Sequence, residues 1–120
     1  MAKKVYAIEP EEANFLILKK NTQSNGLKNI KLVKAAAGRK QGKVAIKKSE
    51  TNLGAHKIIT SGGGIKMIRL DELVKEKVDV IKIDVEGMEA EVIMGAKNLI
   101  KKWKPIIFWE YGVCGRDKSI

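Results

Sequence analysis

The stretch VIKIDVEGMEAEVI, from Val80 to Ile93, decides the fold that this sequence predicts. Its first part is mostly apolar, which is typical of a parallel strand covered on both faces. Two carboxylates, Asp84 and Glu86, end the strand, and Gly87 leads straight into a helix with an acidic first turn. Open α/β sheets bind ligands beyond the carboxyl ends of their strands, so we expect a site here. The alternative is that both carboxylates only cap the helix, whose positive end favours acidic side chains.

Length and composition indicate one domain with a single core, because the chain has 120 residues of which 44% are hydrophobic. We expect this domain to span residues 1–111 and a C-terminal tail to span residues 112–120. Cys114 is the only cysteine, so no disulfide framework exists within the chain and a reducing compartment is the simplest expectation. The sequence shows neither a signal-peptide pattern nor an apolar run long enough for a membrane span. We therefore expect a cytoplasmic protein with no membrane partner.

The formal net charge of +10 raises the possibility of nucleic-acid binding, because a basic surface attracts phosphates. The distribution of charge argues against it, since the lysines are scattered along the chain. Only 5% of the residues are aromatic, which leaves few platforms on which bases could stack. A solvated, lysine-rich surface is the better interpretation.

The N-terminal third predicts a β-α-β unit. A strand at Lys4–Ile8 is followed by a helix that starts around Pro10, and Asn25-Gly26 supplies the turn that ends the helix. A second strand is expected at Asn29–Lys34. The spacing of one helical face predicts that the core side of the helix consists of Ala13, Leu16, Ile17 and Lys20.

The middle of the chain is less regular. A loop is expected at Ala35–Gly38 and a strand at Lys43–Lys47. Two apolar segments flank Ser61–Gly64 and are interpreted as a hairpin, because the glycine run lacks the lysine that follows the glycines of a phosphate-binding loop. His56, the only histidine, lies beside a polar loop, where a surface position is the commoner outcome.

The C-terminal third predicts a short helix capped by Asp71, the strand described above, and one long helix at Met88–Lys102. The helix is expected to pack through Val92, Ala96, Leu99 and Trp103. Pro105 then ends it before a buried strand at Ile106–Trp109. Three predicted strands thus end in acidic residues, and these strand ends are expected to converge on one sheet edge: Glu9, Asp84 with Glu86, and Glu110.

This ordered set of motifs resembles the FkbM family of S-adenosylmethionine-dependent methyltransferases. The resemblance covers roughly Lys4 to Tyr111, and the Lys82–Gly87 stretch is its most distinctive part. It implies an α/β fold, namely a truncated Rossmann-like class I methyltransferase sheet, mostly parallel, with an inserted hairpin. The motifs that carry it are VYAIEP (Val5–Pro10), NGL (Asn25–Leu27), GKV (Gly42–Val44), LDEL (Leu70–Leu73), KIDVEG (Lys82–Gly87) and GA (Gly95-Ala96).

The resemblance also implies the positions that bind S-adenosyl-L-methionine. Glu9 matches the acid that accepts hydrogen bonds from the ribose hydroxyls, a task for which a carboxylate is suited. Ala36 matches a position that borders the adenine ring, although Arg39 stands where the family often has an acid. Asp84 and Glu86 match the motif beside the methionine moiety and the methyl acceptor.

The implied reaction is O-methylation of a hydroxyl on a small molecule or glycan. The protein then has to align the acceptor oxygen, the methyl group and the sulfur, and help to remove the proton of the acceptor hydroxyl. Asp84 is the candidate for the removal of the proton, and Glu86 is the second candidate catalytic residue beside it. The acceptor site is expected to involve Asn52, His56 and Glu110. No metal site is expected, because two carboxylates and one unplaced histidine match no known metal motif.

One departure from the family concerns the first strand and the glycine-rich cofactor loop, which should precede Glu9. Only eight residues precede it and none is glycine, so we expect an internal piece of a methyltransferase domain. In the family's sheet, the missing first strand normally lies between the second and fourth strands. Without it, those two strands must pair directly or be covered by another copy of the chain. Because unpaired strand edges invite association, we expect a homo-oligomer, in the simplest case a dimer. The alternative function is therefore a catalytically inactive remnant that acts as a homo-oligomeric binding module.

Overall fold

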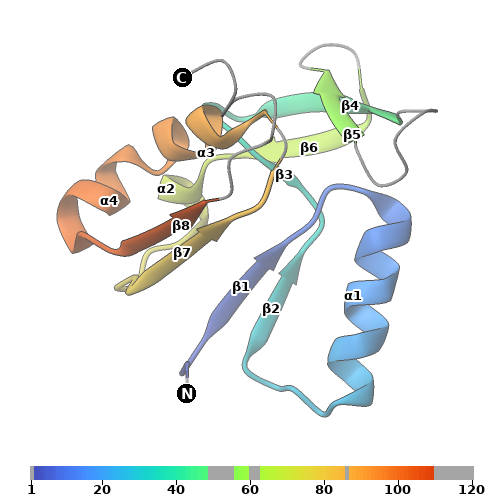
Figure 1. The fold of residues 1–120 in the computed structure, drawn as a ribbon, viewed down its shortest axis with the longest axis horizontal. Coiled ribbons are helices and arrows are strands. Elements are labelled where there is room, and N and C mark those ends of the chain that lie inside the picture. Colours follow the sequence, from blue (N-terminus) through green and yellow to red (C-terminus); the bar gives the residue numbers. More distant parts are fainter. Residues whose placement is uncertain (1, 49–55, 60–62, 86, 110–120) are drawn as a thin grey trace, which may run out of the picture.

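The computed structural model describes residues 2–48, 56–59, 63–85 and 87–109, and it is an α/β fold with three small sheets (Figure 1). Two of the sheets are parallel pairs, and the third has four strands in the order β3-β6-β4-β5. The strands are β1 Val5–Ile8, β2 Ile30–Val33, β3 Ala36–Ala37, β4 Gly42–Lys48, β5 His56–Ile59, β6 Ile65–Ile68, β7 Val80–Ile83 and β8 Ile106–Trp109. The helices are α1 Glu12–Ser24, α2 Leu70–Leu73, α3 Glu89–Gly95 and α4 Lys97–Trp103. None of the helices in these ranges has the length and apolarity to cross a bilayer.

The expected β-α-β unit is confirmed: β1 and β2 pair in parallel and α1 connects them. Glu11 caps the helix, since its side chain accepts a hydrogen bond from the Asn14 N–H at 2.7 Å. Asn25 ends the helix, and Gly26 follows with φ 62°. Local capping chemistry therefore fixes both ends of α1.

The predicted core side of α1 is wrong. Leu16 is 53% exposed and Ile17 is 58% exposed, whereas the buried and half-buried side chains are Glu11, Phe15, Leu18 and Thr22. These two sets lie on opposite sides of the helix, and each contains apolar residues. Spacing alone does not choose between two apolar stripes, and in the fold the stripe that contains Phe15 and Leu18 is the less exposed one.

The middle segment forms the four-stranded sheet, and two expectations about it are corrected. The segment expected to be a loop at Ala35–Gly38 contains β3, which pairs in parallel with β6. The two apolar segments around the glycine run do not pair with each other, because both β5 and β6 pair antiparallel with β4, which lies between them. An antiparallel insertion is present, but β4 is its central strand.

The turn at Gly87 and the helical segment after it follow the prediction in part. Gly87 has φ 79°, a backbone conformation that glycine adopts without a Cβ clash. The expected single helix is wrong, because it divides at Ala96 into α3 and α4. The expected packing stripe is confirmed for Val92, Ala96 and Leu99, which are all less than 7% exposed.

Asp71 does not cap its own helix as predicted; it caps α4, 27 positions further along the chain. Its carboxylate accepts the Asn98 N–H at 3.0 Å and the Leu99 N–H at 2.8 Å, and no side chain of α4 itself supplies a cap. The Asp71 side chain is only 7% exposed, and Arg69 lies 3.4 Å from it. Asp71 thus ties α2 to α4.

We expect Asp71→Ala to lower the free energy of unfolding by about 2 kcal/mol, because it leaves two helix N–H groups near the core without an acceptor. Urea unfolding monitored by circular dichroism measures this loss. Asp79→Ala is the matched control, since Asp79 is 81% exposed and lies 3.8 Å from Lys77, a geometry that contributes little. Equal midpoints for the two variants would show that the cap contributes nothing.

The prediction that the C-terminal parallel strands are covered on both faces is wrong. One face of β7 and β8 packs on the cluster of Leu70, Ile83, Val92 and Ala96, from α2, β7 and the α3–α4 segment. On the other face, where no described element packs, Val80, Ile106 and Phe108 are between 53% and 61% exposed. Only one of the two faces of these strands is therefore buried in the described core.

The strands β1 and β7 do not pair with each other, although both parallel pairs contact one core. Ile8 of β1 packs against the same cluster as Ile81 of β7. Away from this cluster, Glu76 links the two parts, because it accepts hydrogen bonds from Lys4 Nζ at 2.8 Å and from Tyr6 Oη at 2.7 Å. The hydrogen bonds from Lys4 and Tyr6 lower the pKa of Glu76 to about 2.

This contact predicts a pH-dependent contribution to stability. Because the pKa of Glu76 in the folded chain lies below its ordinary value of 4.5, the contribution is present above pH 4.5 and is lost as the pH falls toward 2. We expect Glu76→Gln to melt below the wild type at pH 6, and the difference in Tm to shrink between pH 5 and pH 3. The groups are exposed, so 1 M salt should also shrink the difference. A difference that is constant over this pH range would contradict the prediction.

Candidate functional site

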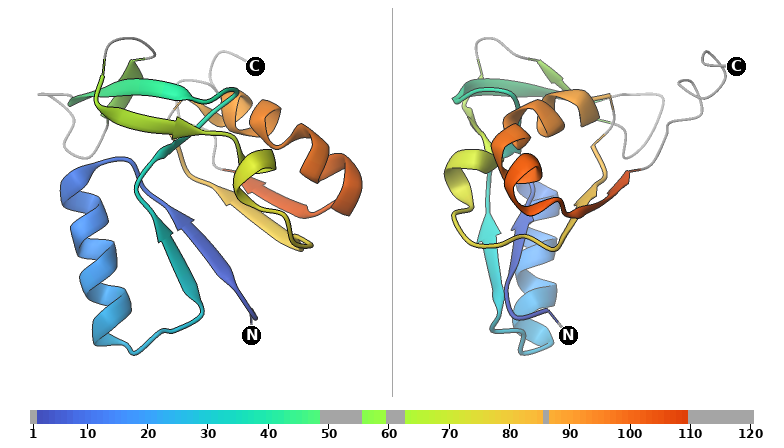
Figure 2. Two further views of the ribbon diagram at one scale, coloured as in Figure 1. Left: turned by 180° about the vertical axis from the view of Figure 1, so that it is seen from behind. Right: turned by 90° about the vertical axis from the view of Figure 1, so that its left-hand side faces the viewer.

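The carboxyl ends of β1 and β7 point toward the same end of the molecule (Figures 1 and 2). Glu9 comes directly after β1 and Asp84 directly after β7, so two of the three predicted acidic strand ends lie at this end. The two carboxylates thus follow strands that run in the same direction (Figure 1). The carboxyl end of such strands is the position at which α/β sheets bind ligands.

Glu9 is held in place by its own backbone and by the start of α1. Its N–H donates to the Val33 carbonyl at 3.0 Å, which continues the pairing of β1 with β2. Its Oε2 accepts the Glu11 N–H at 2.9 Å. Among the described residues no donor reaches Oε1, so one carboxylate oxygen remains available to a ligand.

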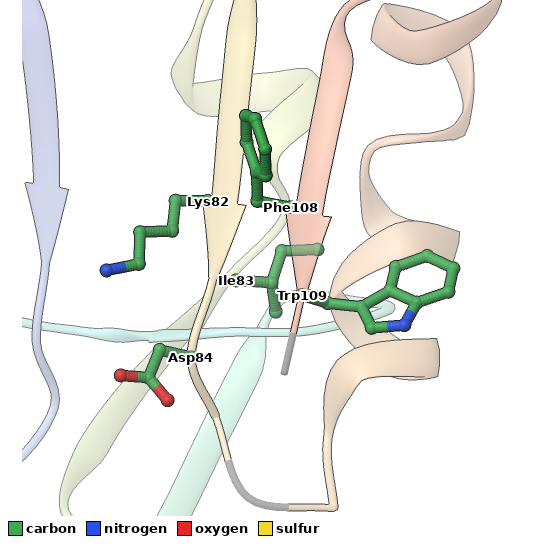
Figure 3. A pocket seen from close by; sticks show the side chains of 5 residues that line it. All are labelled: Lys82, Ile83, Asp84, Phe108 and Trp109. Atoms are coloured by element: carbon green, nitrogen blue, oxygen red, sulfur yellow. The ribbon is translucent and has the colours of Figure 1, made fainter. Parts of the chain in front are cut away.

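Asp84 lines a shallow pocket of about 130 Å³, together with Lys82, Ile83, Phe108 and Trp109 (Figure 3). Lys82 and Asp84 project toward the side on which β1 lies, whereas Trp109 projects toward the helical side. Neither Lys82 nor Asp84 forms an ion pair or hydrogen bond with another described residue, and both are exposed. A cation and a carboxylate are therefore both available to a ligand beside an apolar wall.

The size of this pocket limits what the described residues can enclose. Pockets for small molecules and cofactors measure roughly 300 to 1,000 Å³, and this one is about 130 Å³. The described residues therefore form one wall of a ligand site and do not enclose a ligand of nucleoside size.

Ala36 lies inside the protein, where it is 1% exposed and packs with Val44 and Met67. Its methyl group is thus part of a core cluster, and only its backbone or its neighbours can border a ligand. Arg39, which stands where the resemblance leads one to expect an acid, has its Nε 3.3 Å from Glu91 Oε2. This ion pair connects the segment after β3 to α3.

The side chains of the other predicted site residues are not described by the structure. Glu86, Asn52 and Glu110 lie outside the described residues. His56 begins β5, where the structure describes the backbone only. Within the described ranges, no three side chains of His, Cys, Asp or Glu come together as metal ligands.

Four pocket residues were not among the predicted site residues: Lys82, Ile83, Phe108 and Trp109. Lys82 shares a strand face with Asp84, two positions later, which the alternation of side chains along a strand could have indicated. Phe108 is opposite Lys82 and Trp109 is opposite Ile83 in the register of β7 with β8. That register joins residues 26 positions apart and has no local sequence signal.

The comparison with known protein families matches the methyltransferase FkbM domain over residues 1–113. The chain belongs to this family. In fold it is similar to the crystal structure of methyltransferase FkbM from Methylobacillus flagellatus KT, with a TM-score of 0.59 and 22% sequence identity. The match covers 88% of this chain and 25% of that chain, so the chain spans about a quarter of the length of that relative. No curated protein matches it by sequence.

Membership of the FkbM family and the similar structure confirm the recognised family and the expected Rossmann-like α/β fold. The family match includes both Glu9 and Asp84.

Proposed function

We propose that this FkbM domain contributes the ribose-binding and acceptor-side wall of an S-adenosyl-L-methionine-dependent O-methyltransferase. The observation that carries the proposal is the position of Glu9 and Asp84 directly after two parallel strands that end at the same end of the fold. The acceptor is a hydroxyl group of a small molecule or glycan. The cytoplasm is the compartment in which we expect it to act.

The Glu9 carboxylate fits a ribose because it is fixed by one hydrogen bond and keeps Oε1 available. A carboxylate accepts hydrogen bonds from two adjacent hydroxyls, and charge-assisted hydrogen bonds of this kind are stronger than neutral ones. Ala36 fits the adenine position only through its backbone or its neighbours, because its side chain is buried. The fit is therefore best on the ribose side.

Asp84 fits the role of the group that accepts the acceptor's proton. When bound, S-adenosyl-L-methionine supplies an electrophilic methyl group on a sulfonium. A hydroxyl acceptor must lose its proton as its oxygen is methylated, and Asp84 would accept that proton. The Asp84 carboxylate lies on the rim of the pocket and has no partner among the described residues.

We expect Glu9→Gln to weaken the binding of S-adenosylhomocysteine about tenfold to hundredfold, because the amide keeps the shape but loses the charge-assisted hydrogen bonds. Isothermal titration calorimetry measures this change. Glu12→Gln is the matched control, since Glu12 is an exposed glutamate in the first turn of α1. If Glu9→Gln and Glu12→Gln bind the ligand equally well, Glu9 does not hold the ribose.

A second candidate is a homo-oligomeric binding module without catalysis, and the exposed apolar side chains favour it. Leu16, Ile17, Val80, Ile106 and Phe108 are all more than half exposed. Exposed apolar surface of this kind marks interaction sites. Light scattering at several concentrations tests whether the chain forms a dimer. If the wild type forms a stable dimer and does not bind S-adenosylhomocysteine, the binding module is favoured over the enzyme.

A further inference from the structure

Lys82 is a cation that the proposed methyl transfer does not use, although it lines the pocket together with Asp84 (Figure 3). Its side chain is exposed and forms no ion pair or hydrogen bond with another described residue. Lys4, by contrast, lies 2.8 Å from Glu76, which neutralises it. The positive charge of Lys82 is therefore available to a ligand.

The spacing of Lys82 and Asp84 determines how a ligand can meet both groups. The two residues are two positions apart along an extended chain, so they share a face and their Cα atoms are roughly 6–7 Å apart. Both side chains project toward the side on which β1 lies (Figure 3). Both belong to the described residues, and they form no ion pair with each other. A cation and a carboxylate that stay separate in this way can bind two different groups of one molecule.

Charge decides which group of the ligand each residue can hold. An anionic group beside Asp84 is repelled by its carboxylate, whereas a hydroxyl donates a hydrogen bond to it. The reverse holds beside Lys82, because an ammonium group donates charge-assisted hydrogen bonds to carboxylate or phosphate oxygens. A molecule whose anionic group lies at Lys82 therefore presents a hydroxyl to Asp84.

Phe108 supplies an apolar surface beside these two groups. It is opposite Lys82 in the register of β7 with β8, and it is 58% exposed. Ligand sites commonly combine apolar or aromatic side chains with a few polar groups that fix the orientation of the ligand. The ring of Phe108 is thus a platform for the C–H face of a sugar or of another small ring.

We propose that Lys82 is a specificity-determining residue, which binds an anionic group of the methyl acceptor while Phe108 packs against the acceptor's ring and Asp84 meets its hydroxyl. The anionic group is a carboxylate or a phosphate. The acceptor class is thereby narrowed from hydroxyl compounds in general to acidic sugars and cyclic hydroxy acids. The inference rests on the proposed function in identifying the bound molecule as the acceptor. Its binding, however, is measured without S-adenosylmethionine.

The probes are methyl β-D-glucuronide, methyl β-D-glucoside 6-phosphate and the neutral methyl β-D-glucoside, which have the same ring. Titration of the amide NMR signals of the full chain measures their affinities and identifies the residues that they contact. We expect at least one acidic sugar to bind about fivefold or more tightly than the neutral one, with shifts at Lys82 and Phe108, because its hydrogen bond to lysine is charge-assisted. If neither acidic sugar binds better than the neutral one, the proposal is overturned.

Two variants separate Lys82 from the general positive charge of the chain. Lys82→Gln should lower the affinity for the acidic sugar to that for the neutral sugar and leave the neutral sugar unaffected. Lys66→Gln, an exposed substitution on β6, should change neither affinity. Equal losses in the two variants would show that the net charge attracts the anion, and would overturn the assignment to Lys82.

A charge exchange gives a result that misfolding does not produce. Lys82→Glu should bind methyl 6-amino-6-deoxy-β-D-glucoside more tightly than the acidic sugars, which reverses the order in the wild type. The reversal follows because the charge at position 82 then attracts an ammonium group and repels an anion. If Lys82→Glu keeps the wild-type order, Lys82 does not select the charge of the ligand.

S-adenosylhomocysteine also carries a carboxylate, and its affinity distinguishes the cofactor from the acceptor as the source of the anion. We expect Lys82→Gln to leave this affinity within about threefold of the wild-type value. A larger loss would assign Lys82 to the cofactor and overturn the proposal. If the wild type binds the acidic sugar through Lys82 but does not bind S-adenosylhomocysteine, the proposed enzyme fails while the anion site stands, so the two failures are distinguishable.

Discussion

Asp84→Asn is expected to slow methyl transfer by about a hundredfold or more, since proton transfer by a positioned side chain contributes typically 10²–10⁴ to a rate. An amide has the shape of the carboxylate but does not accept a proton. Because the Asp84 side chain is exposed on the pocket rim, the substitution should leave the fold intact. The measurement is the release of S-adenosylhomocysteine with a panel of sugars and small alcohols as acceptors, at saturating S-adenosylmethionine.

The control for Asp84→Asn separates chemistry from binding. The affinity of this variant for S-adenosylhomocysteine should fall far less than its transfer rate, and its thermal melting should be unchanged. Asp79→Asn is the matched substitution, because Asp79 precedes the same strand and lies at its other end. If Asp84→Asn and Asp79→Asn transfer the methyl group at the same rate, Asp84 does not accept the proton.

Gly95→Ala is expected to lower the free energy of unfolding by about 3 kcal/mol, at the upper end of the usual cost of overpacking. A Cβ at this position would lie 1.9 Å from the carbonyl oxygen of Gly38, a backbone atom that has no rotamer through which to move away. The Gly38 backbone is itself fixed, because its N–H donates to the Ile68 carbonyl at 2.8 Å. The end of α3 therefore approaches the segment after β3 at a distance that only glycine permits.

Urea unfolding of Gly95→Ala beside Gly42→Ala measures this effect. Gly42 begins β4, and a Cβ there would have no neighbour within 4 Å, so its replacement should change stability by less than about 0.5 kcal/mol. The prediction is wrong if the two variants unfold at the same urea concentration. A large loss confined to Gly95→Ala would establish that close backbone packing holds α3 against the segment after β3.

The candidate site could be predicted only where it depends on residues close together in the chain. The acidic residue after a strand is visible in the sequence at both Glu9 and Asp84, because the apolar run and the acid are adjacent. Two further pocket residues, Phe108 and Trp109, line the pocket with Asp84 through the register of β8 on β7. Sequence pattern does not specify that register, because each strand is apolar along most of its length.

The sequence by itself determined the local elements of this protein. The turn residues Asn25-Gly26 end α1, Gly87 turns the chain from β7 toward α3, and Pro105 separates α4 from β8. Each of these signals acts through backbone conformations and hydrogen bonds within about four residues. The order of strands and helices follows from them, together with the family to which the chain belongs.

Only the tertiary structure decided how these elements meet. It selected the Phe15 side of α1 for burial, made Asp71 the cap of α4 in place of its own helix, and put β4 between β5 and β6. It also placed β1 and β7 in separate sheets over a shared apolar cluster. The physical reason is that burial and strand pairing depend on which surfaces come together across the whole chain, whereas caps and turns depend on neighbouring residues alone.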